Sequence, residues 1–130
     1  PAQEGYEQVD FETLLTQSDI ISVHAPLNEH TEGLINSKAF EKMKSSCIFL
    51  NLGRGPIVDE QALYNALVKN QIAAAGLDVL CKEPMSADNP LLKIKDSKRL
   101  LITPHIAWAS VEARTHLMEI IHEQVKDFFA

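Results

Sequence analysis

Four side chains capable of acid–base or carboxylate chemistry each follow a short apolar run of the sequence. Arg54 comes after the run at 48–50, Asp78 and Glu83 after the run at 73–77, and His105 after the run at 100–102. In an open parallel α/β sheet, ligands bind in the crevice beyond the carboxyl ends of the strands. We therefore expect these four residues to gather in one site.

These residue types could serve proton transfer beside a bound carboxylate. Taken singly, Arg54 could equally be a surface ion-pair partner, Glu83 a solvated loop residue and His105 a strand-end histidine. An imidazole exchanges protons near neutral pH, so His105 is the predicted general acid or base. A carboxylate such as Glu83 can hold one ring nitrogen and favour the imidazolium form. Arg54 offers a planar fork of donors that suits a substrate carboxylate and polarises a carbonyl.

The elements that must position these residues alternate between strand and helix. Apolar runs predict strands at 6–9, 19–24, 47–52, 72–79 and 100–103. Helical spacing behind capping residues predicts helices at 10–15, 36–44, 59–70 and 110–129, with a helical turn at 91–94. The strand at 47–52 is apolar on nearly every residue, which is typical of burial on both faces of a parallel sheet. The pattern predicts an α/β fold with right-handed crossovers.

Length and composition limit the classes of protein to consider. The chain has 130 residues, 45% of them hydrophobic, and a formal net charge of −6. This length predicts one domain, and the acidic balance without a Lys/Arg cluster disfavours nucleic acid or an anionic membrane as a partner. Cys47 and Cys81 lie far apart without metal-ligand spacing, so we interpret them as buried thiols of a protein in the reducing cytoplasm.

Four blocks of the sequence together carry a resemblance to a known family. They are Ser-Val-His-Ala-Pro-Leu at 22–27, Asn-Leu-Gly-Arg-Gly at 51–55 with Val-Asp-Glu at 58–60, Gly-Leu-Asp-Val at 76–79 with Glu-Pro at 83–84, and Thr-Pro-His at 103–105. In order and spacing they resemble the C-terminal signature blocks of the NAD-dependent D-isomer-specific 2-hydroxyacid dehydrogenases. The resemblance covers about residues 6–130. The run at 104–110 is most similar to the glycerate dehydrogenase, or hydroxypyruvate reductase, branch.

The resemblance implies a fold, a reaction and a set of site residues. The fold would be an incomplete Rossmann-like parallel sheet with flanking helices. The reaction would move a hydride between a nicotinamide cofactor, NAD or NADP, and a D-2-hydroxy or 2-keto acid. Arg54, Glu83 and His105 would be catalytic, and Asp78 would hold the nicotinamide carboxamide. The residues implied to line the cofactor are Ala25, Pro26, Leu52, Gly53, Arg54, Asp78, His105, Ala107 and Trp108.

The chain also departs from the family pattern. Family members open their nucleotide-binding domain with a Gly-rich turn that receives the pyrophosphate, followed by an acidic residue that holds the ribose. Neither feature is present, and Gly53 and Gly55 have the wrong context. We therefore interpret residues 1–130 as the C-terminal part of a nucleotide-binding domain without its substrate domain, ending in a long helix at 110–130. By itself this piece is expected to bind NAD weakly or not at all and to be inactive. A bare sheet edge predicts self-association, most simply as a homodimer.

Several other interpretations stay open. A non-catalytic NAD-sensing relative, similar to the transcriptional corepressors of this family, would keep the same Arg-Glu-His set. Formate dehydrogenases are disfavoured because they are expected to carry Gln where Glu83 stands. A response-regulator-like module is disfavoured because the first strand lacks an acidic cluster for Mg²⁺. Individually, Asp78 could cap a turn, His24 could be structural, and Trp108 could line the substrate mouth or simply pack.

Overall fold

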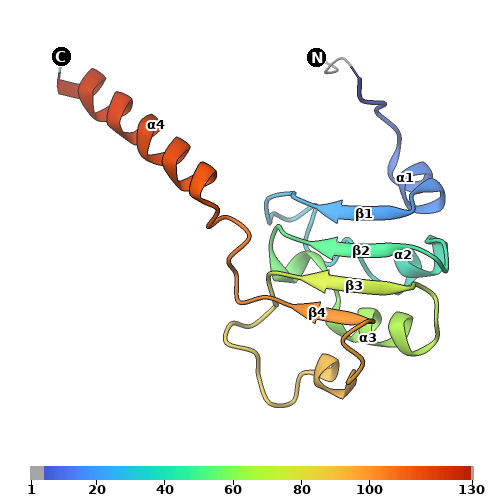
Figure 1. Cartoon of the computed structure of the whole chain (residues 1–130). Helices are drawn as coiled ribbons and strands as arrows, with labels where there is room; N and C mark the ends of the chain where they lie inside the picture. Colours follow the sequence, from blue (N-terminus) through green and yellow to red (C-terminus); the bar gives the residue numbers. More distant parts are fainter. Residues whose placement is uncertain (1–4, 130) are drawn as a thin grey trace.

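A computed structural model describes residues 5–129 and shows one parallel sheet with helices beside it (Figure 1). The elements in chain order are α1 (Phe11–Gln17), β1 (Ile20–Val23), α2 (Ser37–Lys42), β2 (Ile48–Asn51), the 3₁₀ turn η1 (Gly55–Ile57), α3 (Glu60–Val68), β3 (Ala74–Leu77), the 3₁₀ turn η2 (Pro90–Lys93), β4 (Leu100–Ile102) and α4 (Val111–Phe129). The strands lie in the order β1-β2-β3-β4, and every neighbouring pair is parallel. The predicted α/β class and its incomplete parallel sheet are confirmed, whereas the strand predicted at 6–9 is wrong, because those residues form no ladder.

Capping side chains start the helices where the sequence predicts them. Asp10 accepts from the backbone N–H of Thr13, and Asn36 accepts from those of Lys38 and Ala39. Asp59 accepts from Gln61 and Ala62 at the start of α3. Each cap satisfies backbone donors that have no partner inside the first turn of a helix.

The core lies between the sheet and one layer of helices. Phe40 of α2 packs edge-to-face on Phe49 of β2, with ring centroids 5.4 Å apart, and Leu63 and Leu67 of α3 are equally buried. The opposite face of the sheet is open in the described residues, where Ile20 is 62% and Ile48 40% exposed. The expectation that the strand at 47–52, which is β2 in the structure, is buried on both faces is therefore wrong, because α2 and α3 cover only one face.

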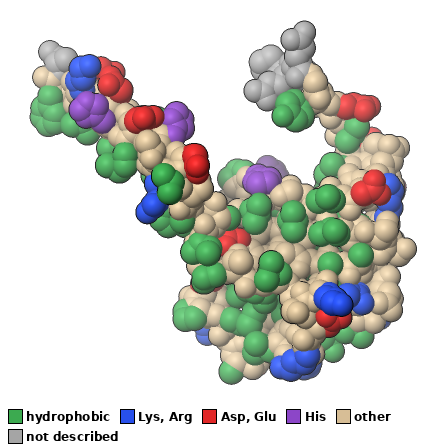
Figure 2. Space-filling model, viewed as in Figure 1, with side chains coloured by type: hydrophobic (Ala, Val, Ile, Leu, Met, Phe, Trp, Pro, Cys, Tyr) green, Lys and Arg blue, Asp and Glu red, His purple; other side chains and the backbone are tan. Residues whose placement is uncertain are grey.

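The last helix stands apart from the sheet. α4 runs away from the end of β4 (Figures 1 and 2), and none of its residues is buried. Ser110 Oγ accepts from Ala113 N at 3.1 Å, which confirms the predicted start of this helix. Within residues 5–129, no helix combines the length and the apolar composition needed to cross a membrane.

All four strands point the same way, so their carboxyl ends lie along a single edge of the sheet (Figure 1). The loops that leave this edge carry His24, Arg54, Asp78, Glu83 and His105. The topology therefore brings the predicted chemistry to one side of the molecule.

Candidate active site

A histidine and a glutamate form the centre of the site. His105 Nδ1 lies 2.8 Å from Glu83 Oε2, and both side chains are about two-fifths exposed. The other oxygen, Oε1, accepts from the backbone N–H of Leu80 at 2.9 Å. These two hydrogen bonds, that from Leu80 first and that from His105 second, lower the pKa of Glu83 below its ordinary value. The carboxylate therefore stays ionised and can balance a charged imidazole.

His105 is held in an uncommon backbone conformation. Its φ angle is +57°, in the left-handed region that non-glycine residues seldom occupy. Its N–H donates to Thr103 O at 3.0 Å, and its carbonyl accepts from Trp108 Nε1 at 2.9 Å. Such strained residues persist only where the surroundings hold them, and they cluster at functional sites. The hydrogen bond from Trp108, which is itself 59% exposed, therefore helps to hold the turn at His105.

Asp78 forms hydrogen bonds with the residues on both sides of His105 in the same turn. Its Oδ1 accepts from Thr103 Oγ1 at 2.6 Å and from Ile106 N at 2.9 Å, and its Oδ2 accepts from Ala107 N at 2.8 Å. Burial alone would raise the pKa of Asp78, but these hydrogen bonds and the nearby His105 lower it overall. A contact from Asp78 to a nicotinamide stays a prediction, and it would have to use a remaining lone pair of this carboxylate.

Arg54 sits on a tight turn directly after β2. The buried Asn51 holds this turn, because its Nδ2 donates to Arg54 O at 3.1 Å and its Oδ1 accepts from Gly53 N at 3.2 Å. The Arg54 side chain is exposed and donates from Nη1 to Gly53 O at 2.9 Å. Among residues 5–129, no hydrogen bond engages its Nε or Nη2, and these donors suit an anionic ligand.

Gly55 allows the turn that carries Arg54 to contact the loop that carries Glu83. A Cβ atom on Gly55 would lie 1.9 Å from Leu80 O, so no larger residue fits against this backbone. Leu80 in turn donates its N–H to Glu83. The turn of Arg54 and the loop of Glu83 are therefore in direct backbone contact.

Three hollows follow the carboxyl edge and share lining residues. One lies at Asp78, Glu83 and His105, and another lies at 24–27 and 52–54. A third contains Asp78 and Thr103 from the first and Leu52 from the second, so the hollows form a continuous surface. Of the predicted cofactor-lining residues, Ala25, Pro26, Leu52, Gly53, Arg54, Asp78 and His105 lie on this surface.

The remaining candidates lie outside the centre of the site. Nε2 of His24 is 2.8 Å from Ser22 Oγ, which agrees with a structural role. Ala107 meets Asp78 through its backbone only. Cys81 is exposed, so the prediction of two buried thiols is correct for Cys47 only. Partial desolvation first and the charge of Glu60 second raise the pKa of the Cys81 thiol to about 11, which makes it a poor nucleophile. His30, His116 and His122 are exposed.

Sequence reasoning missed three residues that support the site. Asn51 could have been found, since a polar side chain ends an otherwise apolar run. Glu60 and Asn89 hydrogen-bond each other across 29 positions of the chain, and no local pattern signals that pairing.

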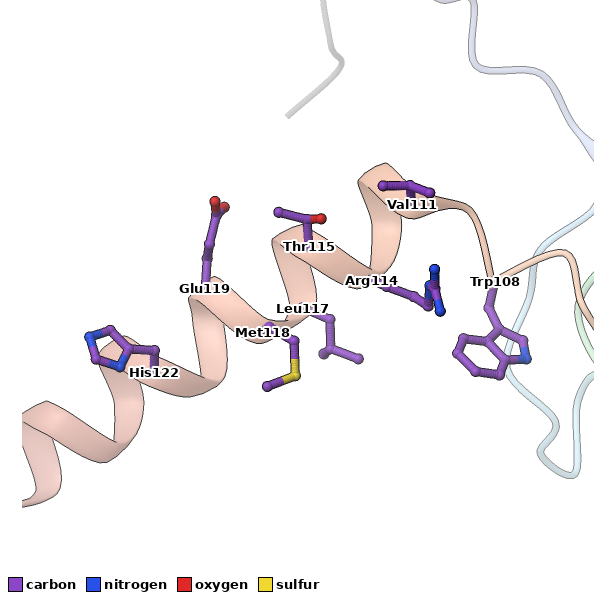
Figure 3. Close-up of a pocket in the computed structure, with 8 residues that line it drawn as sticks. All are labelled: Trp108, Val111, Arg114, Thr115, Leu117, Met118, Glu119 and His122. Carbon is purple, nitrogen blue, oxygen red and sulfur yellow. The ribbon is translucent and has the colours of Figure 1, made fainter.

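A separate wide hollow lies along α4 and Trp108 (Figure 3). Figure 3 shows Trp108 beside the first turns of the helix, with the Arg114 side chain extending toward it. Leu117 and Met118 are both at least half exposed along this helix. The hollow contains none of Arg54, Asp78, Glu83 and His105, so it is not part of the candidate active site.

A parallel sheet with flanking helices and with its ionisable side chains at the carboxyl edge has the architecture of a Rossmann-like nucleotide-binding domain. Comparison with known families specifies it further. Residues 1–107 match the model for "D-isomer specific 2-hydroxyacid dehydrogenase, NAD binding domain", and the chain belongs to this family. The resemblance noted in the sequence is thereby confirmed.

Individual relatives agree with this membership. The chain is 46% identical over 125 residues to a hydroxypyruvate reductase of Blautia hydrogenotrophica, covering 96% of this chain and 38% of the relative. It is 50% identical over 123 residues to a D-3-phosphoglycerate dehydrogenase of Archaeoglobus fulgidus, covering 95% of this chain and 23% of the relative. The chain thus spans at most about two-fifths of these curated relatives.

Solved structures give the same fold. An acyclic imino acid reductase in complex with NADPH and D-Arg superposes with a TM-score of 0.86 at 37% identity, over 99% of this chain and 40% of that one. A D-lactate dehydrogenase with NAD⁺ from Lactobacillus jensenii gives a TM-score of 0.75 at 38% identity, over 86% of this chain and 37% of that one.

Proposed function

We propose that the protein transfers a hydride between a nicotinamide cofactor and a D-2-hydroxy or 2-keto acid of the glycerate/hydroxypyruvate or glyoxylate type. The observation that carries this proposal is the 2.8 Å pair of His105 and Glu83, with the Arg54 turn packed against the same loop. Relatives named hydroxypyruvate reductase, glycerate dehydrogenase and glyoxylate reductase support the substrate class.

The carboxyl edge fits a flat nucleotide ligand. A Cβ atom on Gly53 would lie 3.0 Å from Ala25 O, so glycine at this position lets the loops that follow β1 and β2 approach each other closely. Ala25, Pro26, Leu52 and Gly53 would hold the cofactor, which is NAD or NADP, and Ala107 and Trp108 would flank it. When bound, the nicotinamide supplies or accepts the hydride. Neighbouring structures that contain NAD⁺ or NADPH support this assignment.

His105 exchanges the proton that accompanies the hydride. Its Nδ1 is engaged by Glu83, so Nε2 is the ring atom left to give a proton to the substrate oxygen in reduction or to take one in oxidation. Glu83 orients the ring and balances its charge in the protonated form. Because Asp78 fixes the backbone of the histidine turn, the ring is positioned before substrate arrives.

Arg54 binds the substrate carboxylate. Its planar guanidinium presents paired donors that match the two oxygens of a carboxylate, which fixes the 2-carbon relative to His105. The exposure of Arg54 and the contact of its turn with Leu80 support this role.

The proposal extends to assembly and location. The open sheet face and the uncovered α4 support self-association, most simply as a homodimer. The free thiols of Cys47 and Cys81 agree with a cytoplasmic location. Residues 1–130 alone are proposed to be inactive, because residues 5–129 contain no Gly-rich turn to receive a pyrophosphate.

The deciding experiment is an assay of the whole protein as its gene encodes it. Hydroxypyruvate and glyoxylate are offered with NADH or NADPH, and His105→Ala and Arg54→Ala serve as variants. We expect His105→Ala to lower kcat by about 10²–10⁴-fold, which is the usual contribution of a general acid. Turnover at background level by the unaltered protein contradicts the enzyme and favours an NAD-sensing regulator.

A further inference from the structure

Glu60, which is not one of the proposed catalytic residues, forms hydrogen bonds with both ends of the loop that carries Glu83. Glu60 is the first residue of α3, directly after the N-cap Asp59. Its Oε1 accepts from Cys81 N at 2.8 Å, and its Oε2 accepts from Asn89 Nδ2 at 2.8 Å. The two contacts lie on opposite sides of Glu83 in the chain. One side chain on a rigid helix therefore closes the loop at both ends.

The far end of this loop is fixed independently of Glu60. Asn89 is only 6% exposed, and its Oδ1 accepts from Leu91 N at 2.9 Å at the start of η2. Two carboxylate or carbonyl oxygens repel each other, whereas the amide nitrogen of Asn89 can donate to Glu60 while the amide oxygen stays on Leu91 N, so the direction of the hydrogen bond is determined. Glu60 is half-buried and sits at a helix N-terminus, where a carboxylate is stabilised.

We infer that Glu60, acting with Asn89, is a positioning residue for the acid–base pair of Glu83 and His105. It holds the 81–89 loop against α3, so that Glu83 reaches His105 Nδ1 and Leu80 N at the same time. Glu60 does not contact the pair itself and takes no part in proton transfer. The inference rests on the proposed function for its kinetic consequence, but its structural consequence can be measured without turnover.

The charged and polar groups around Glu83 determine its pKa, which can be measured without turnover. Glu83 faces His105 and the backbone N–H of Leu80, and the carboxylate of Asp78 lies near enough to oppose its ionisation. When the loop loosens, Glu83 loses both donors, and its pKa rises toward the ordinary value of a glutamate. A purely structural role of Glu60 would leave this titration unchanged in the fraction that stays folded.

The test uses three substitutions in the whole protein. Glu60→Gln keeps an acceptor for Cys81 N but presents an amide nitrogen to the Asn89 amide nitrogen. Asn89→Asp keeps the cap on Leu91 N but presents a carboxylate to Glu60. Together, Glu60→Gln and Asn89→Asp exchange donor and acceptor and restore the hydrogen bond. Gln61→Ala, on the next position of α3, is the control, because the Gln61 side chain donates to Asn65 Oδ1 and its contact with the cap Asp59 is made by the backbone N–H, which alanine keeps.

Two measurements are made on each variant. The first is the titration of the Glu83 side-chain carboxyl by ¹³C NMR, assigned with Glu83→Gln. The second is the pH profile of kcat and KM for 2-keto acid reduction. In both single variants we expect the titration midpoint of the Glu83 carboxyl to rise, and the acid limb of the kcat profile to move to higher pH with it. We expect kcat to fall by roughly 10- to 100-fold, because a positioned catalytic group is displaced. KM is expected to change less than kcat.

The double variant decides between positioning and simple damage. If Glu60 positions the pair, the exchanged hydrogen bond restores the Glu83 midpoint and most of kcat, with a clear coupling between the two sites. A Glu83 midpoint that is unchanged in the folded single variants, or a double variant no better than either single one, overturns the inference. Absence of 2-keto acid reduction by the unaltered protein defeats the proposed function only, since the carboxyl titration still reports on Glu60.

Discussion

Gly55 and Leu80 touch through their backbones, and this contact joins the turn of Arg54 to the loop of Glu83. A Cβ atom on Gly55 would lie 1.9 Å from Leu80 O and 2.4 Å from Cys81 N. Both opposing atoms belong to the backbone, so neither can move away cheaply. The contact couples the proposed carboxylate-binding residue to the proposed acid–base pair at a fixed spacing.

Gly55→Ala is therefore expected to damage both stability and activity. Overpacking of this kind costs about 1–3 kcal/mol and sometimes more, because two loops must separate. Urea unfolding of the 130-residue chain measures the loss, and the assay of the whole protein measures kcat.

Gly33→Ala is the matched control for this substitution. Gly33 has a φ of +63° but nothing within 4 Å of its ideal Cβ, so alanine there meets strain without a clash. We expect a cost of about 1–2 kcal/mol from the left-handed backbone and no change in kcat. An equal loss of kcat in both variants would show that the Gly55–Leu80 contact has no special role.

Asp78→Asn tests the anchor of the histidine turn. The carboxylate accepts hydrogen bonds from Thr103, Ile106 and Ala107, whereas an asparagine has only one oxygen and places an amide nitrogen before a backbone donor. Leaving a buried donor unsatisfied costs about 1–3 kcal/mol, so we expect a loss of that size at pH 7. Asp88→Asn, which alters an exposed hydrogen bond from Ser86, is expected to change stability by less than about 0.5 kcal/mol.

The same variant gives a pH test with a definite sign. The pKa of Asp78 is lower in the folded chain than its ordinary value, so the folded state favours the ionised form. Its stabilisation is fully present above the unfolded pKa of about 3.9 and is lost as the pH falls through the folded value. The difference in unfolding free energy between the unaltered chain and Asp78→Asn should therefore narrow below about pH 4. A difference that stays constant from pH 7 to pH 3 contradicts this assignment.

The success of sequence reasoning followed the range of the interactions. Caps such as Asp59 act within three residues, and strand ends such as the one before His105 are bounded by local residue types, so both were predictable. The gathering of Arg54, Glu83 and His105 followed from the rule for parallel sheets. Glu60 and Asn89 could not be found in this way, since their pairing depends on how a loop folds back onto α3.

The burial of β2 was predicted incorrectly from its sequence. Its apolar residues predict two covered faces, but Ile48 is 40% exposed in the described chain. Periodicity reports how apolar a face is and carries no information on what covers it. The same reasoning applies to α4, whose apolar residues find no partner within residues 5–129.

Arg99 provides a prediction that separates stability from chemistry. Its Nη2 donates to Leu67 O at 2.7 Å and to Ile72 O at 3.2 Å, and its Nη1 donates to Asn70 Oδ1 at 2.8 Å. The guanidinium thus closes the connection between α3 and β3 with a fork that lysine cannot reproduce. We expect Arg99→Lys to lower the unfolding free energy by about 1–3 kcal/mol. Lys98→Ala is the control, and kcat of the whole protein should be unchanged in both.

The open sheet face predicts self-association of the 130-residue chain. Ile20 of β1 and Leu101 of β4 are each more than 60% exposed on this sheet, and α4 adds further uncovered apolar side chains such as Val125. Exposed apolar surface of this kind marks interaction sites, and a second copy of the chain can bury it. We expect light scattering at high protein concentration to report a dimer or larger species for the unaltered chain. Ile20→Lys with Leu101→Lys should shift the population toward monomer. The urea midpoint measured at a dilution where the unaltered chain is monomeric should not change, since neither residue is buried in the single chain. A strictly monomeric unaltered chain at the same concentration contradicts the proposed association.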